Sequence, residues 1–226
     1  LPYIISVRAV GDFSLALAGD GTVWAWGQNN VGQIGDGTTT DRQTPVRVSG
    51  LTGIIAVAAG ASHALALKDD GTVWSWGYNY NGQLGDGSTT AHHTPVRVSG
   101  LTDVTAIACG SYFSLSRKAD GSIWTWGANN FGQLGDGTTT DRTAPVQVTG
   151  LIDMIAITGG YSHTLSINMD GTIMSWGRNN YGQLGDGTAT DRTIPVTAFV
   201  INLPPALNMA IPNQTRPENS PAWTID

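Results

Sequence analysis

Charged residues are scarce in this sequence: they make up 12% of its 226 residues, about half the share of an ordinary globular protein. Cysteine is almost absent too, since Cys109 stands alone and no disulfide can form within the chain. The 11 Lys and Arg residues form no cluster, and the net charge is −6. The sequence therefore lacks the basic footprint of a nucleic-acid-binding protein, and we expect no nucleic-acid partner.

Long apolar runs are also missing. No run approaches the ~20 residues of a membrane-spanning helix, and the first residues do not resemble a secretory signal peptide. We therefore expect no membrane insertion. Acids, bases and nucleophiles do not gather outside the repeated pattern described below, so the sequence predicts no enzyme, no catalytic residues and no cofactor.

Candidate metal ligands are few. His92 and His93 are adjacent but lack the third ligand of a zinc site. The Gly-Asp-Gly-Thr segment at 35–38 and its copies supply oxygen atoms, without the closely spaced acidic residues that calcium requires. We predict no metal site, and we interpret His63 and His163 as hydrogen-bonded structural residues.

What the sequence has in abundance is repetition with a period of 50 residues. The segment QNNVGQIGDGTTTDR at 28–42 returns at 78–92, 128–142 and 178–192 with few changes. Four tryptophans keep the same step, each followed by glycine: Trp26, Trp76, Trp126 and Trp176. Repeats of this period are typical of solenoids and propellers, so a motif seen in every copy is more plausibly architecture than chemistry.

One repeat, residues 51–100, shows the pattern of a small sheet. Runs at 54–59, 63–67 and 72–76 have the composition or alternation of strands, and a fourth begins at Pro95. Asp-Gly between the second and third runs is a strong hairpin signal. We predict an all-β protein whose repeats are four-stranded antiparallel blades of a β-propeller, with the repeated Trp-Gly tryptophans buried between blades.

These residues also carry a family resemblance. The string from Val57 to Gly87, with its Asp-Gly hairpin, Trp-Gly and Gly-Gln-Leu-Gly-Asp-Gly elements, resembles the repeat of the regulator of chromosome condensation family. The resemblance covers residues 1 to about 196 and implies a propeller, seven-bladed in the family's best-known members. It also implies protein-binding roles, among them inhibition of a β-lactamase by a secreted bacterial member. Nucleotide exchange on a nuclear GTPase would need an insertion that these uniform repeats lack.

The number of repeats predicts an incomplete ring. Four repeats occupy 1–50, 51–100, 101–150 and 151–196, whereas the family's blades are shaped for a larger ring. An open arc would leave an apolar blade face bare. We therefore expect either a partial propeller or half of a ring that a second chain completes as a homodimer.

The remaining segment, 197–226, has no copy of the repeat and holds five of the ten prolines. We expect it to contain the end of the last strand, a linker, and the start of a truncated second domain. Its last part resembles the opening strand of an immunoglobulin- or cadherin-like module of bacterial surface proteins. This resemblance predicts a bacterial protein located outside the cell or on its surface.

Positions where the repeats differ point to a binding face. In an up-and-down blade, the turn between the first two strands and the long loop after the third emerge on the same side. At equivalent positions of these loops the four repeats carry different large residues, while the strand residues stay nearly the same. Folds that recognise partners through loops on a constant scaffold have this pattern. Tyr and Arg are enriched at interface hot spots. The candidate partner-binding residues are Tyr78, Tyr80, Tyr112, Phe131, Tyr161, Arg178 and Tyr181.

The favoured function is a non-enzymatic, protein-binding propeller scaffold whose partner the sequence does not name. Two alternatives stay open. The tyrosines could stack on sugar rings in a glycan-binding module, or the same loops could inhibit an enzyme.

Overall fold

The computed structural model describes residues 2–198, which form sixteen β-strands and no helix. Each repeat folds into one sheet of four antiparallel strands in sequence order, here called blades one to four. Blade one contains β1 (Ile4–Val10), β2 (Phe13–Ala18), β3 (Val23–Gly27) and β4 (Arg42–Arg47). Blade two contains β5 (Ile54–Ala59), β6 (His63–Lys68), β7 (Val73–Gly77) and β8 (His92–Arg97). The prediction of an all-β fold made of four-stranded blades is confirmed.

The other two blades repeat this plan. Blade three contains β9 (Val104–Cys109), β10 (Phe113–Lys118), β11 (Ile123–Gly127) and β12 (Arg142–Gln147). Blade four contains β13 (Met154–Gly159), β14 (His163–Asn168), β15 (Ile173–Gly177) and β16 (Arg192–Thr197). No helix long and apolar enough to span a bilayer occurs in the part of the chain that the structure describes. The predicted linker and second-domain start lie, from residue 199 on, outside the described residues.

The hairpin between the second and third strands forms where Asp-Gly predicts it. In blade two, the Thr72 amide donates to Asp70 Oδ1 at 3.0 Å, and Gly71 has a φ of 76°, which glycine adopts without strain. The fourth strand departs from the prediction, because β8 begins at His92 rather than at Pro95. Proline is tolerated inside β8 because this strand lies at the edge of its sheet.

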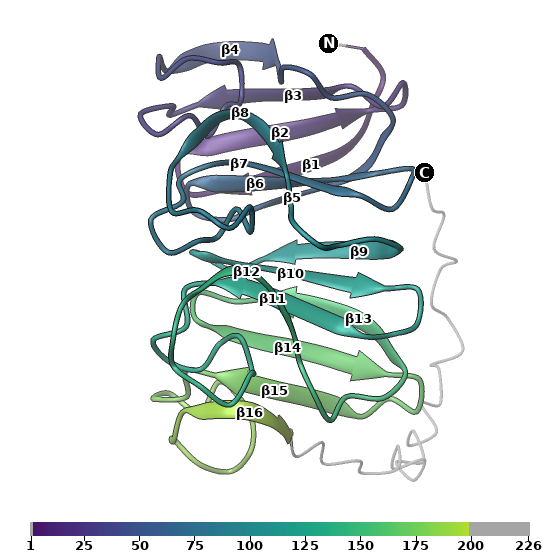
Figure 1. The fold of residues 1–226 in the computed structure, drawn as a ribbon, viewed down its shortest axis with the longest axis vertical. Coiled ribbons are helices and arrows are strands. Elements are labelled where there is room, and N and C mark those ends of the chain that lie inside the picture. The colour runs from purple at the N-terminus through teal and green to yellow at the C-terminus, as the bar shows by residue number, and fades with distance from the viewer. Residues whose placement is uncertain (1, 199–226) are drawn as a thin grey trace, which may run out of the picture.

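The four blades follow one another in an open arc. Figure 1 shows the first blade, in purple and blue, and the last, in yellow-green, at opposite ends of the long axis. The innermost strands contact their neighbours in series, β1 with β5, β5 with β9, and β9 with β13. The described residues are therefore a partial propeller whose two end blades do not meet.

Tryptophan fills the space between successive blades. Trp76 packs with Leu15, Leu17 and Val23 of blade one. In the same way, Trp126 packs with Leu65 and its neighbours on blade two, and Trp176 with Ile123 of blade three. All three tryptophans have 0% exposure, so each interface is built around a fully buried indole.

Trp26 does not follow the prediction of burial between blades. It is only half-buried, although it occupies the same position in blade one. The reason is the open arc: within residues 2–198, no blade precedes blade one. For the same reason Val7 is 62% exposed, while its counterpart Val57 is 2% exposed.

Candidate functional site

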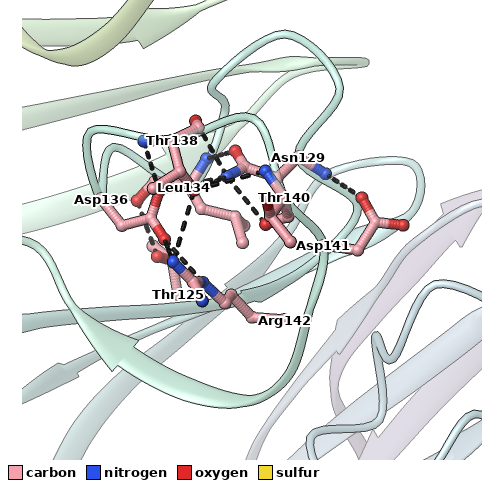
Figure 2. Close-up of polar contacts among 8 residues, drawn as sticks. All are labelled: Thr125, Asn129, Leu134, Asp136, Thr138, Thr140, Asp141 and Arg142. Carbon is pink, nitrogen blue, oxygen red and sulfur yellow. Dashed lines mark hydrogen bonds and ion pairs between the residues drawn. The ribbon is translucent and has the colours of Figure 1, made fainter.

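The long loop after the third strand is held closed by one buried asparagine in each repeat. In blade three the Asn129 side-chain amide donates to the carbonyl oxygens of Thr138 and Thr140, both at 3.1 Å. Its Oδ1 accepts from the Leu134 amide at 3.0 Å (Figure 2). Asn29, Asn79 and Asn179 make the same contacts in their own loops. The loop is thus a rigid platform that depends on its own hydrogen bonds.

An aspartate and an arginine secure the outer part of the loop in blades one, three and four. Asp136 Oδ2 accepts from Arg142 Nε at 2.7 Å, and its Oδ1 accepts from the Thr138 hydroxyl at 2.7 Å. Burial by itself would raise the pKa of Asp136, but the hydrogen bonds from Thr138 and Arg142 outweigh it and hold the pKa below its usual value. The Gly-Asp-Gly-Thr segments therefore use their carboxylates to order the loop.

Blade two replaces this arginine with His92. Its Nε2 lies 2.9 Å from Asp86 Oδ2, so the histidine takes the structural place of the arginine in the other repeats. The neighbouring His93 lies instead against Gly32 of blade one, where the loop and strand come close. Among the described residues, no three His, Cys, Asp or Glu side chains are grouped so that they could hold a metal ion.

His63 has a structural role within the core. It is fully buried, and its Nε2 lies 3.0 Å from the Ser114 hydroxyl of blade three. Ser114 donates its only hydroxyl hydrogen to the Gln83 carbonyl oxygen at 2.8 Å, so Nε2 must carry the ring proton and donate to Ser114. Burial lowers the pKa of His63 to about 3. A neutral histidine of this kind joins two blades.

The arrangement of connections agrees with the expected two faces. The amide of Tyr78, at the start of the long loop, donates to the carbonyl oxygen of Ser62 in the first turn at 2.9 Å. On the opposite side, the hairpin amide of Asp69 donates to Gly53 in the linker between blades at 2.9 Å. We call the side with the first turns and long loops the loop face.

Three of the predicted residues come together on the loop face. The rings of Tyr78 and Tyr80 stack with their centroids 6.5 Å apart, and Tyr112 of blade three meets Tyr78 edge to face at 6.0 Å. Tyr80 is 75% exposed, whereas Tyr78 is half-buried. Burial raises the pKa of the Tyr78 phenol, as do Tyr112 and Tyr80. These three residues are the tyrosine cluster.

A cavity of about 360 Å³ opens beside the tyrosine cluster. It spans three blades, and its wall combines aromatic rings with amide groups. Its lining residues are Gln28, Asn30, Val31, Ser62, Tyr78, Asn81 and Tyr112. Asn30 and Ser62 were not predicted as site residues. The prediction selected positions where the repeats differ, and Asn30 and Ser62 each have the same residue in at least one other repeat.

The other predicted residues lie apart from the cluster. The Arg178 guanidinium stacks over the Phe131 ring at 4.8 Å, which links the loops of blades three and four. Tyr161 and Tyr181 are exposed at 67% and 87%. Neither makes a stacking contact with another ring within residues 2–198. The candidate residues thus form one cluster, one pair and two isolated side chains.

Four-stranded antiparallel blades packed in series through tryptophans define a β-propeller repeat protein. The loops with their repeated Asn, Asp and Trp-Gly elements belong to that scaffold. The chain belongs to the RCC1-like domain family, whose model matches residues 2–216. This agrees with the resemblance found in the repeats.

Solved structures give the same result. Human WBSCR16 is similar with a TM-score of 0.79 and 26% identity, over 88% of this chain and 54% of that one. Yeast RCC1 (Prp20) bound to Kap60 has a TM-score of 0.77 and 22% identity, over 88% and 49%. A structure of Prp20p from Saccharomyces cerevisiae gives 0.76 and 23%, over 88% and 51%. The chain thus spans about half the length of the solved structures it matches.

Proposed function

We propose that this chain is a non-enzymatic scaffold that binds a protein partner through the loop face. The observation that carries the proposal is the tyrosine cluster. Tyr78, Tyr80 and Tyr112 come from two adjacent repeats, and no other repeat has a tyrosine at any of the three equivalent positions. They nevertheless gather beside one cavity on a rigid surface.

The physical properties of the cluster suit a protein contact. Tyrosine offers a large contact area with little conformational entropy to lose, and such residues dominate interface hot spots. The loops beneath them are fixed by the buried asparagines, so binding needs little reordering. In one solved structure Kap60 is bound to yeast RCC1, whose fold is similar, so a protein of this fold has a protein partner.

The test compares two matched triple variants as baits. One carries Tyr78→Ala, Tyr80→Ala and Tyr112→Ala on the loop face. The other carries Lys68→Ala, Asp69→Ala and Met169→Ala on the opposite side, where Met169 is 77% exposed. A protein captured from the source organism should be retained by the wild type and the second variant and lost by the first.

The captured protein is then purified and titrated against each variant. We expect single substitutions in the cluster to weaken binding by about 1 kcal/mol or more in at least two cases, while Tyr80→Ala changes folding stability by less than about 0.5 kcal/mol. Equal binding by both triple variants, or loss only in the Lys68 variant, would place the contact elsewhere.

A glycan-binding module is the second candidate, and the cavity favours it. Amide groups of Gln28, Asn30 and Asn81 stand next to aromatic rings, and aromatic walls with a few polar groups are typical of small-molecule sites. A glycan array separates the two functions, because a protein binder gives no signal on it. Inhibition of an enzyme by the loop face is a special case of protein binding, and an activity assay with the captured partner identifies it.

The proposal for the wider setting of the protein rests on the sequence. We propose that it is part of a bacterial protein that lies outside the cell or on its surface, as the resemblance of the last residues indicates. The net charge of −6 and the absence of a basic cluster support a partner other than nucleic acid. A ring completed by a second copy is a separate proposal, which concerns the ends of the arc and not the loop face.

A further inference from the structure

Blade four ends in an apolar socket of the kind that is filled on blades one and two. On blades one and two, the tryptophan of the next blade packs against three residues. Two of them are leucines two positions apart in the second strand, and the third is the first residue of the third strand. Leu15, Leu17 and Val23 hold Trp76, and Leu65, Leu67 and Val73 hold Trp126. All these residues are almost completely buried.

The corresponding residues of blade four are Leu165, Ile167 and Ile173. They are only half-buried, and with Ala156 and Thr158 they line an open cavity of about 210 Å³ whose wall is almost entirely apolar. Nothing within residues 2–198 covers this cavity. Gly182 also lacks a neighbouring blade within the described residues. Its counterparts Gly32, Gly82 and Gly132 each lie close to the next blade, but Gly182 lies close only to its own loop.

Blade one carries the matching half of this interface. Trp26 is half-buried and Val7 is exposed, whereas their counterparts Trp76 and Val57 are buried against blade one. The polar groups match as well. Trp126 and Ser114 both donate to the carbonyl oxygen of Gln83 on the preceding blade. Blade one presents Trp26 and Ser14 at these positions, and blade four presents the carbonyl of Gln183.

We propose that a second copy of this chain docks its first blade on blade four, with its Trp26 in the socket formed by Leu165, Ile167 and Ile173. The Trp26 indole and the Ser14 hydroxyl of that copy donate to the Gln183 carbonyl oxygen. The contact continues the series of three blade-to-blade contacts inside the chain, each of which is built around a fully buried tryptophan. This proposal does not depend on the function of the loop face.

Residues 2–198 of each copy offer one docking tryptophan and one socket, so the contact is head to tail. Two such contacts between two copies close a ring with two-fold symmetry. The ring has eight blades, twice the four that residues 2–198 of one copy form, and this number lies within the range that propellers form. Closure removes both exposed apolar faces at once, which an open series of copies does not.

The test is the mass of the full 226-residue chain in solution, measured by sedimentation velocity over a range of concentrations. We expect a dimer. Trp26→Ala and Ile173→Lys should each weaken association at least about tenfold, since a buried tryptophan and its pocket are typical hot spots. Ile155→Lys is the matched control, because Ile155 belongs to the same blade but is 50% exposed and lies outside the socket. It should leave association unchanged.

Mixing the two weakened variants shows whether a substitution has removed the contact or has unfolded the chain. The Ile173→Lys chain keeps its Trp26, and the Trp26→Ala chain keeps its socket, so the mixture should form a one-to-one complex with a single intact contact. A wild-type chain that stays monomeric at every concentration would overturn the proposal. A dimer that both variants leave intact would overturn it as well.

Discussion

Trp126 donates its indole N–H to the main-chain carbonyl oxygen of Gln83 in the preceding blade, at 2.9 Å. The same oxygen accepts the Ser114 hydroxyl at 2.8 Å. Trp76 makes the equivalent bond to Gln33 at 3.0 Å, but Ala64 has no hydroxyl to add to it. Between blades three and four, Thr164 donates to the Gln133 carbonyl at 2.9 Å, while Trp176 Nε1 has no hydrogen-bond partner among the described residues. The three interfaces thus use the same kind of acceptor, a glutamine main-chain carbonyl oxygen at the equivalent position, and differ in which side chains donate to it.

The contribution of an interface tryptophan can be measured with a matched pair of substitutions. We expect Trp126→Ala to lower the free energy of unfolding by about 3–5 kcal/mol, because it removes a fully buried indole and leaves a cavity. Trp26→Ala should cost less than half as much, since Trp26 is only half-buried. Chemical denaturation at concentrations where the chain is monomeric makes the comparison. Equal losses would contradict the open arc.

Two glycines of one loop separate a steric effect from a conformational one. Gly85 and Gly87 both have positive φ, 69° and 92°, so alanine is strained at either position. A Cβ at Gly85 would also lie 2.6 Å from Trp126 Nε1, whereas nothing lies within 4 Å of a Cβ at Gly87. We expect Gly87→Ala to cost about 1–2 kcal/mol and Gly85→Ala clearly more. Thermal unfolding of the two variants gives the order, and the reverse order would refute the contact.

The buried asparagine should be essential to its loop. Asn129→Ala leaves the carbonyl oxygens of Thr138 and Thr140 and the Leu134 amide without their partner. Leu134 is fully buried, and its unpaired amide alone costs about 1–3 kcal/mol, so we expect a loss of at least about 1 kcal/mol. Hydrogen exchange at the Leu134 amide should accelerate in parallel. Asn130→Ala, at the exposed neighbouring position, is the control and should have little effect on either measurement.

His63 should make stability depend on pH in a defined window. Because burial holds the pKa of folded His63 at about 3, the unfolded chain binds an additional proton below about pH 6.5. The contribution of His63 is therefore fully present above pH 6.5 and is lost progressively as the pH falls towards 3. Between pH 7 and pH 5 this loss should amount to about 1–2 kcal/mol.

The control is His63→Phe, because Phe13 and Phe113 already occupy the equivalent positions. This variant should fold at pH 7 and lose less stability than the wild type between pH 7 and pH 5. Urea unfolding at the two pH values provides the comparison. An identical loss in both proteins would show that His63 titrates normally in the folded state.

Most of the scaffold could be predicted because each local signal occurs four times. Asp-Gly marked the hairpin between the second and third strands of every blade, alternation marked those two strands, and the repeated tryptophan marked the interface. The start of the fourth strand escaped, because His92, His93 and Thr94 precede a proline and have no strand-like alternation. Only pairing with β7 places them in the sheet.

The candidate site was harder to predict because it depends on distances between repeats. Sequence variation identified Tyr78, Tyr80 and Tyr112, but it gave equal weight to Tyr161 and Tyr181, which lie apart. Whether residues of neighbouring repeats touch depends on the rotation from one blade to the next, which no single repeat encodes. Trp26 shows the same limit: its sequence context is that of Trp76, and only its place at the end of the arc exposes it.

The tryptophan and its socket lie on opposite sides of every blade, and this has a consequence for how such a chain evolves. A duplicated stretch of 50 residues brings both halves of the joint with it, so the new copy fits its neighbours without any compensating mutation. Unequal recombination can therefore lengthen or shorten the array by whole units.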